Sequence, residues 1–131
     1  MEIISAAIDV RQRAYAPYSG YFVGAALEDE EHRIHVGTNV ENVSYAATIC
    51  AERSAISSMI SAGGRQILRV AVATKDGGFP CGICLQTILE FAQNPQAVEI
   101  VTVNETGQVK IFQLSQLIPL GFDSSEVHRT V

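Results

Sequence analysis

The sequence is organised around Cys50-Ala51-Glu52-Arg53 and, later in the chain, Pro80-Cys81-Gly82-Ile83-Cys84. These two stretches contain all three cysteines of the chain and a glutamate two residues after the first of them. Three thiolates can occupy three corners of a zinc tetrahedron, which leaves the fourth corner free for water. A glutamate beside that open corner is suited to moving protons in a hydrolytic reaction. The pattern therefore predicts a catalytic site with Glu52 beside one zinc ion and three ligands: Cys50, Cys81 and Cys84.

A different interpretation makes Cys50 a buried core thiol and the Cys81–Cys84 pair a redox centre. A thioredoxin-type pair should open a helix after the first strand of its fold, whereas this pair comes late in the chain. A chain of this length also buries enough surface to need no disulfide framework. We therefore favour metal binding.

The composition fits a single domain that spans residues 1–131. Hydrophobic residues make up 47% of the chain, charged residues make up 18%, and the formal net charge is −5. An acidic chain has no basic surplus with which to neutralise phosphates, so we expect no nucleic-acid polymer as partner. A single nucleoside carries no phosphate and is not excluded. No apolar run approaches the roughly 20 residues of a membrane span, and the start does not resemble a signal peptide, which favours a cytoplasmic protein without membrane contact.

Hydrophobic periodicity and turn residues predict alternating helices and strands. Helices are expected over 2–14, from a cap at Ser44 or Thr48 to about 61, over 81–93 and, after a cap at Ser115, over 115–118. Strands are expected over 21–27, 33–40, 67–74, 98–103 and 108–112, with the acidic run 28–32 as a solvated turn. This order predicts an α/β fold, a three-layer α/β/α sandwich with a mixed five-stranded sheet.

Asn39 and Glu41 come at the end of the second predicted strand. Residues i and i+2 of a strand point to the same side, so these two side chains should share a face. An amide and a carboxylate placed together could bind the vicinal hydroxyls of a sugar. An Asx-type turn with a solvated glutamate explains the same residues equally well.

The cysteines are expected at the N-termini of two neighbouring helices, where the helix dipole favours thiolates. Three thiolates make a zinc site negative, so bound water is a weaker acid unless charge is withdrawn from sulfur. Arg53 could withdraw charge by donating hydrogen bonds to the thiolates, and its alternative role is a surface ion pair.

The sequence offers no fourth cysteine and no histidine in a finger-like spacing. His32 lies in the polar turn, His35 lies in an alternating strand, and His128 lies in a polar tail, so none of the three is assigned to zinc. A closed structural site would have a fourth protein ligand, and we therefore expect an open, catalytic position.

These stretches resemble the zinc signature of the cytidine deaminases. Further stretches match the same family in order, namely Tyr18-Ser19 with 23–27, then 39–45, and finally 117–122. The likeness covers nearly the whole chain, and the combination is far more specific than a lone Cys-x-x-Cys pair. It implies the fold of the small, homotetrameric, three-cysteine cytidine deaminases, with one zinc ion per subunit.

The resemblance also implies an activity, the hydrolytic deamination of cytidine and deoxycytidine to uridine and deoxyuridine in pyrimidine salvage. In that family a zinc-bound hydroxide attacks C4 of cytosine. The glutamate at the position of Glu52 shuttles a proton from water to N3 and then to the departing amine.

The substrate-binding residues follow from the same resemblance. Asn39 and Glu41 would bind the ribose 3′-hydroxyl, the backbone of Ala51 would read the base edge, and the ring at Tyr21 would pack on the base. Two residues would act across subunit boundaries: Tyr45 near the 5′-hydroxyl and Phe122 near the base.

Three positions depart from the family's usual pattern. The family usually has Phe at Tyr21, Ser at Phe79 and Arg at Leu85, and without that arginine only Arg53 and the helix dipoles offset the thiolate charge. Two alternative functions remain. One is deamination of a modified aminopyrimidine nucleoside, as in blasticidin deaminases, and the other is that of a non-catalytic, zinc-stabilised nucleoside-binding module. The stretch 39–42 favours cytidine and deoxycytidine, and a pure scaffold has no need of Glu52.

Overall fold

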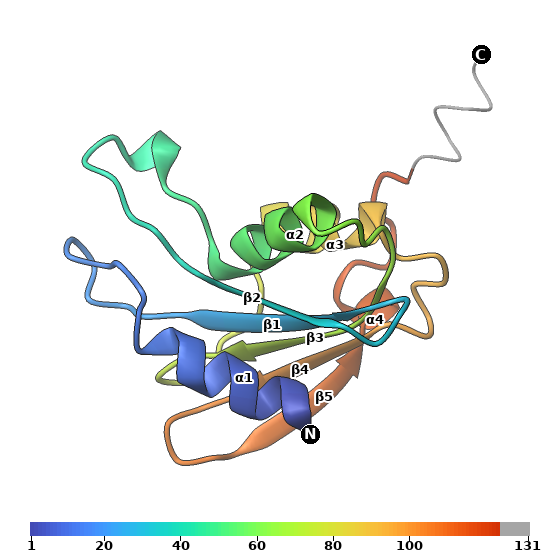
Figure 1. The fold of residues 1–131 in the computed structure, drawn as a ribbon, viewed down its shortest axis with the longest axis horizontal. Coiled ribbons are helices and arrows are strands. Elements are labelled where there is room, and N and C mark those ends of the chain that lie inside the picture. Colours follow the sequence, from blue (N-terminus) through green and yellow to red (C-terminus); the bar gives the residue numbers. More distant parts are fainter. Residues whose placement is uncertain (124–131) are drawn as a thin grey trace.

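The computed structural model describes residues 1–123 and contains one five-stranded sheet with helices on both faces (Figure 1). The elements follow in the order α1 (Glu2–Arg11), β1 (Gly24–Asp29), β2 (Ile34–Thr38), the 3₁₀ helix η1 (Tyr45–Ala47), α2 (Ala51–Ser61), β3 (Ile67–Ala73), α3 (Gly82–Glu90), β4 (Glu99–Val103), β5 (Val109–Gln113) and α4 (Leu114–Leu117). No helix within the described residues has the length and apolar character required to cross a membrane.

The sheet is mixed, as predicted, with the strand order β2-β1-β3-β4-β5. β1 pairs antiparallel with β2 and β3, β3 pairs parallel with β4, and β4 pairs antiparallel with β5. Parallel neighbours need a crossover connection, and α3 supplies it between β3 and β4. The outer pairs are hairpins, in which Leu27 faces His35 and Val101 faces Ile111.

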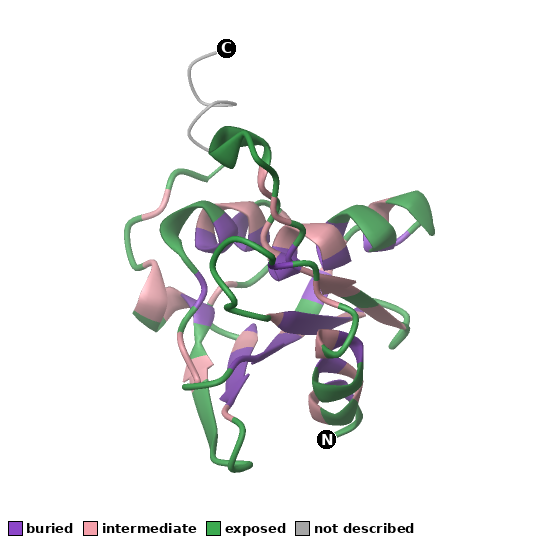
Figure 2. Cartoon of the chain, turned by 90° about the vertical axis from the view of Figure 1, so that its left-hand side faces the viewer, coloured by how far each residue is buried: buried purple, intermediate pink, exposed green. Residues whose placement is uncertain are grey.

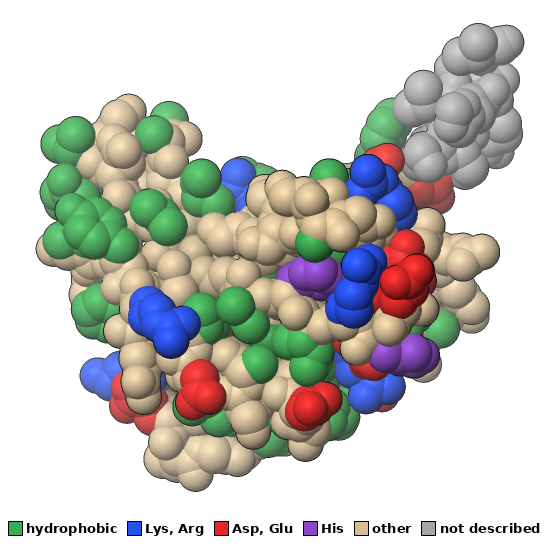
Figure 3. Space-filling view, in the orientation of Figure 1, with side chains coloured by type: hydrophobic (Ala, Val, Ile, Leu, Met, Phe, Trp, Pro, Cys, Tyr) green, Lys and Arg blue, Asp and Glu red, His purple; other side chains and the backbone are tan. Residues whose placement is uncertain are grey.

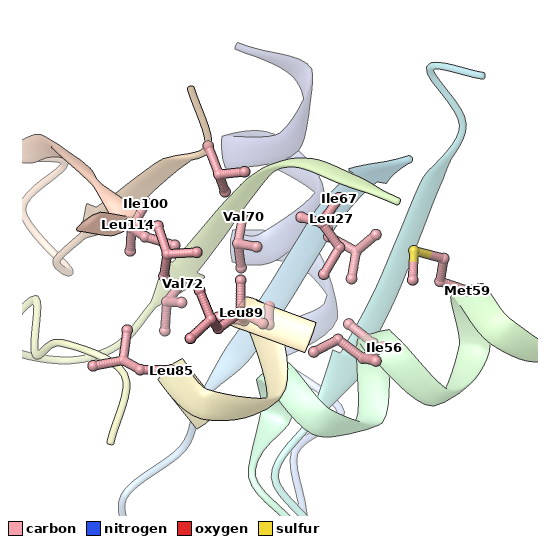
Figure 4. Close-up of a cluster of buried hydrophobic side chains, with 14 of the residues drawn as sticks. Leu27, Ile56, Met59, Ile67, Val70, Val72, Leu85, Leu89, Ile100 and Leu114 are labelled. Carbon is pink, nitrogen blue, oxygen red and sulfur yellow. The ribbon is translucent and has the colours of Figure 1, made fainter. Parts of the chain in front are cut away.

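Helices cover both faces of the sheet, which confirms the predicted three-layer architecture. α1 contacts β1, β2 and β3 on one face, and α2 contacts the same three strands from the other. Figure 2 shows the buried residues concentrated in the sheet and on the helix faces that meet it. The apolar cluster between the sheet and α2 and α3, drawn in Figure 4, contains side chains such as Leu27, Val70, Ile100, Ile56 and Leu89.

Two glycines allow the helices to approach the sheet closely. A Cβ on Gly24 would lie 2.2 Å from the carbonyl oxygen of Ala7 in α1, and one on Gly37 would lie 2.4 Å from the backbone nitrogen of Ala55 in α2. A glycine in a strand often marks such a close backbone approach. The contact at Gly37 holds α2, which carries Glu52 in its first turn, directly against β2.

Several element boundaries differ from the sequence predictions. α1 ends at Arg11 rather than at 14, and β1 begins at Gly24 rather than at 21. Neither Ser44 nor Thr48 caps α2, because residues 45–47 form a separate 3₁₀ turn and Cys50 is the N-cap residue of α2. α4 begins at Leu114, where Gln113 and Gln116 form a capping box in place of the predicted cap at Ser115.

The acidic run 28–32 is not the fully solvated turn that was predicted, because Asp29 is completely buried at the end of β1. Its carboxylate accepts hydrogen bonds from Arg33 Nε and from the backbone N–H groups of Glu31 and Arg33, each at 2.9 Å. His35 Nε2 lies 2.8 Å from the same carboxylate. These partners replace the water that a buried carboxylate loses. His35 thus belongs to a buried polar cluster, whereas His128 lies outside the described residues.

Candidate active site

The three cysteines converge where α2 and α3 begin. Cys50 and Cys81 are the N-cap residues of the two helices, and Cys84 lies in the first turn of α3. The three Sγ atoms all lie within 4.8 Å of one another, and those of Cys50 and Cys81 are 4.0 Å apart. Zn–S bonds of about 2.3 Å in a tetrahedron place sulfur atoms roughly 3.8 Å apart. The cluster is therefore compatible with one zinc ion.

The surroundings of the cluster favour thiolates, because unpaired N–H groups and the positive ends of two helix dipoles face it. Hydrogen bonding from the Cys84 thiol, assisted by Arg53, lowers the pKa of Cys50 to about 5. Arg53 Nη2 lies 3.9 Å from Cys50 Sγ and 3.4 Å from the carbonyl oxygen of Thr48. The structure thus places Arg53 beside a thiol of the cluster. Leu85, on α3, packs into the hydrophobic core and adds no charge to the cluster.

Glu52 occupies the first turn of α2 and is only 5% exposed. It lines the same cavity as Cys50 and Cys81. Burial raises the pKa of its carboxyl to about 7, and the negative charge of Cys50 acts in the same direction. A carboxyl with this pKa can both accept and release a proton near neutral pH, which general acid–base chemistry requires.

The cavity beside the thiols has a volume of about 210 Å³. Among the residues assigned to substrate binding from the sequence, Tyr21, Asn39 and Ala51 belong to its lining. The complete lining is Tyr21, Val23, Asn39, Thr48, Ile49, Cys50, Ala51, Glu52, Val72, Thr74, Gly78, Phe79 and Cys81.

Phe79 is a lining residue that the sequence predictions did not assign to the substrate. Its ring packs edge-on against Phe112 of β5, with the ring centroids 5.0 Å apart. The available signal was its position directly before Pro80-Cys81, because a residue that leads into a metal ligand lies near the metal.

Asn39 and Glu41 have different hydrogen-bond partners and border different spaces. The Asn39 side chain accepts a hydrogen bond from Val23 N–H at 3.0 Å and donates one to the carbonyl of Tyr21 at 2.7 Å. The Glu41 carboxylate accepts hydrogen bonds from the backbone N–H groups of Tyr18 and Ser19, at 2.9 and 3.0 Å. Glu41 borders a neighbouring hollow of about 310 Å³ that shares only Thr48 with the cavity of Glu52.

Tyr45 and Phe122 also lie outside the lining of the cavity that contains Glu52. Tyr45 borders the hollow of Glu41, and its side chain is 77% exposed. Phe122 is exposed as well, and its backbone is fixed to α3, since Gln86 Oε1 accepts from its N–H at 3.1 Å and Gln86 Nε2 donates to its carbonyl.

A larger cavity of about 460 Å³ lies on the α1 side of the sheet. Its lining includes Arg11 and Glu105, which pair with each other at 3.1 Å. The lining contains no cysteine, so this cavity is not equipped for the chemistry that the thiol cluster supports.

The fold, with its thiol cluster and buried glutamate, places the chain among the zinc deaminases that act on nucleobases. The family model of the cytidine and deoxycytidylate deaminase zinc-binding region matches residues 1–101, and the chain belongs to this family. The predicted fold class, family, enzyme class and zinc cofactor are thereby confirmed.

Individual relatives agree with this assignment. The chain is 36% identical to the cytidine deaminase of Halalkalibacterium halodurans over 128 residues, which cover 96% of each chain. It is 38% identical to the cytidine deaminase of Mycoplasma genitalium over 117 residues, which cover 87% of this chain and 88% of the relative. The crystal structure of cytidine deaminase from Burkholderia pseudomallei superposes with a TM-score of 0.85 at 39% identity and covers 92% of this chain and 97% of its own.

Proposed function

We propose that the protein catalyses the hydrolytic deamination of cytidine and deoxycytidine to uridine and deoxyuridine. The observation that carries this proposal is the position of Glu52, buried in the same cavity as the Cys50 and Cys81 thiols. A purely structural zinc site has no use for a carboxylate at an open corner, whereas a hydrolytic site needs a group that moves protons. The cytidine deaminases among the chain's relatives support the choice of substrate.

A zinc ion held by the three cysteines would supply Lewis-acid activation of water. Glu52 then accepts the proton of the attacking water and delivers it to N3 of the pyrimidine. The same carboxyl then takes the proton of the hydroxyl now bound to C4 and transfers it to the amine nitrogen. The C4–N bond breaks as the C4 carbonyl forms, so cytidine and water give uridine and ammonia. Arg53, beside Cys50, offsets part of the thiolate charge.

The nucleoside would extend from the cavity of Glu52 toward the hollow of Glu41. The backbone of Ala51, at the start of α2, would bind the base edge, and the Tyr21 ring would pack on the base. Asn39 and Glu41 would bind the ribose 3′-hydroxyl from the two adjoining spaces.

A second copy of the chain would complete each site in a homotetramer. Tyr45 and Phe122 are exposed and lie outside their own cavity, so they are free to reach the 5′-hydroxyl and the base in a neighbouring subunit. We place this reaction in pyrimidine salvage in the cytoplasm, where reducing conditions keep the three thiols available for zinc.

The direct test is an ultraviolet assay of the zinc-loaded protein with cytidine and with deoxycytidine. We expect both substrates to be converted, with release of ammonia in equal amount to the uridine or deoxyuridine formed. Turnover of only a modified aminopyrimidine nucleoside would contradict the proposed substrate. Nucleoside binding by calorimetry without any turnover would instead indicate a non-catalytic binding module.

A further inference from the structure

Tyr21 is held at each of its three polar groups. Its backbone N–H donates to Ser19 Oγ at 3.0 Å, and its carbonyl accepts from Asn39 Nδ2 at 2.7 Å. Ser19 Oγ in turn donates to the Glu41 carboxylate. The third group, the phenolic hydroxyl, donates to Asp76 Oδ1 at 2.6 Å. Tyr21 is therefore connected to both residues on the ribose side of the site and to the loop that follows β3.

Asp76 lies in the loop that connects β3 to Cys81 and forms part of a tight turn. Thr74 Oγ1 accepts from the N–H groups of Gly77 at 2.8 Å and Gly78 at 3.0 Å, and Asp76 Oδ1 accepts from Gly78 N–H at 3.2 Å. Gly78 lies directly against the phenol, since a Cβ there would come within 3.0 Å of the Tyr21 hydroxyl. Tyr21 and Gly78 line the cavity, whereas Asp76 lies outside the lining and is hydrogen-bonded to both of these residues.

We propose that Asp76 is a positioning residue for the nucleoside. Through the Tyr21 hydroxyl it fixes the tyrosine ring in the cavity wall and joins the loop before Cys81 to the ribose side of the site. The inference rests on the function proposed above and concerns the same cavity. It gives the hydroxyl a role that a phenylalanine at this position, which is usual in the family, would not provide.

The effect of Asp76 should appear in substrate binding rather than in the chemical step. Asp76 is outside the lining, so it does not contact the reacting atoms, and the ring that it holds is in place before the transition state forms. Interactions that are equal in the ground state and the transition state change KM and leave kcat unchanged. A role restricted to folding would not produce this division between the two constants.

The test compares zinc-loaded wild type, Tyr21→Phe, Asp76→Ala and the double variant in steady-state deamination of cytidine. We expect each single variant to raise KM about fivefold, as for the loss of one hydrogen bond to a charged acceptor at a partly exposed site. Because Asp76 acts on the tyrosine ring through their shared hydrogen bond, the double variant should raise KM by less than the product of the two single effects. kcat should stay within about twofold of wild type in all three.

Two further variants sharpen the comparison. Asp76→Asn keeps an acceptor oxygen at the same place and should restore most of the wild-type KM. Asp9→Asn, on the exposed side of α1, is the matched control and should leave KM unchanged. An unchanged KM in Tyr21→Phe, multiplicative effects in the double variant, or a fall in kcat alone would each overturn the proposal.

A second measurement separates this inference from the proposed function. Burial and the hydrogen bond to Asp76 raise the pKa of Tyr21 above its ordinary value of 10.0. Subtracting the phenolate absorbance of Tyr21→Phe from that of wild type isolates the titration of Tyr21, which should occur at this raised pKa. Asp76→Ala should lower the pKa of Tyr21. If wild type has no deaminase activity, the proposed function fails, and uridine affinity by calorimetry replaces KM in the comparison. If Asp76→Ala changes neither the titration nor the affinity, the positioning role is wrong whatever the activity.

Discussion

Glu52 combines burial with direct access to the cavity. Its side chain is 5% exposed, and it lies in the first turn of α2 beside the N-cap thiol of Cys50. Burial raises the pKa of a carboxyl because the charged form loses its water. A solvated glutamate would be almost fully ionised at neutral pH and would return a proton less readily to the leaving amine.

We expect Glu52→Gln to lower kcat by about a thousandfold, because an amide of the same shape cannot carry the proton. Zinc content and the far-ultraviolet circular dichroism spectrum should match those of wild type, since the glutamine fits the same space. Glu90→Gln, at the exposed end of α3, is the control and should keep full activity. Normal turnover by Glu52→Gln would show that another group moves the proton.

Arg53 is a cation in direct contact with the thiol cluster. Its Nη2 lies 3.9 Å from Cys50 Sγ, and its Nε is buried without a hydrogen-bond partner among residues 1–123. Leu85, where the resemblance to the family led us to expect a second arginine, is buried in the core. Arg53 and the two helix dipoles are therefore the groups that we expect to offset the thiolate charge.

Arg53→Gln should weaken zinc affinity about 10- to 100-fold, the usual cost of losing a partner that supports the metal ligands. The measurement is zinc transfer to a chromophoric chelator under equilibrium conditions. Arg13→Gln, an exposed substitution just after α1, provides the comparison. Equal zinc affinity in both variants would remove Arg53 from the support of the site.

At the scale of elements, the β1–β2 hairpin is held by the buried carboxylate of Asp29. Burial alone would raise the pKa of Asp29, but hydrogen bonds involving His35, Arg33 and Glu31 outweigh it and lower the pKa from 3.8 to about 2. A carboxyl whose pKa is lower in the folded state stabilises the fold above its unfolded pKa. That stabilisation should decrease as the pH falls from about 4 through about 2.

Asp29→Asn should therefore lower the free energy of unfolding near pH 7 by about 1–3 kcal/mol, through loss of hydrogen bonds to a charged acceptor. The difference between wild type and variant should shrink as the pH falls through 3.8 toward 2, because the wild-type carboxyl becomes neutral. The test is to measure the urea unfolding midpoints of wild type and variant at several pH values. Effects of acid on other groups occur in both proteins and cancel in the difference between them. A difference that is constant down to pH 2 would contradict the assignment.

The contrast between Asp29 and Cys50 shows what the sequence could predict. Strands and helices were recognisable because their apolar periodicity reflects burial of one face. The thiols and Glu52 were recognisable because their chemistry is unusual at that spacing. Asp29 was missed because an acidic run normally lies in water, and its burial depends on partners that the hairpin brings together only in three dimensions. The start of α2 was misplaced because cysteine is not among the side chains that typically cap a helix.

Asp76 was missed for a related reason. Its partner, Tyr21, is distant in the sequence, and residues 75–80 were predicted only as the connection between the strand 67–74 and the helix 81–93. The local signal was the Asp-Gly-Gly sequence, which is typical of a tight turn with a side chain that binds nearby backbone N–H groups. That signal predicts a turn, but it does not predict which side chain from another segment reaches it.

At the scale of the whole molecule, hydrophobic side chains gather on two segments that project beyond the sheet, residues 15–22 and 40–49 (Figure 3). The two segments lie side by side at their base, where Tyr15 bridges to Val40. Tyr18 and Tyr45 meet edge-on at 6.4 Å and are both exposed. Contiguous exposed apolar surface of this kind marks a site of protein association. It adjoins the hollow of Glu41, so a second subunit placed here would also cover the ribose side of the site.

Subunit mixing tests whether the sites are completed across subunits. Glu52→Gln lacks the proposed proton carrier but keeps Phe122, whereas Phe122→Ala keeps Glu52. Each variant expressed alone should have reduced activity with cytidine. In oligomers formed by co-expression in equal amounts, about a quarter of the sites should combine an intact Glu52 with a neighbour's Phe122. Specific activity should therefore exceed the mean of the two separate variants, and light scattering should report a tetramer.

The outcome separates two roles for Phe122. If Phe122 only stabilises its own protomer, where Gln86 binds its backbone, activity of the mixture will equal the mean of the separate variants. If it reaches a neighbouring site, mixing restores activity although no single chain carries both intact residues. An active monomer by light scattering would exclude completion across subunits altogether, because a residue that lies outside the cavity of its own protomer then has no route to the substrate.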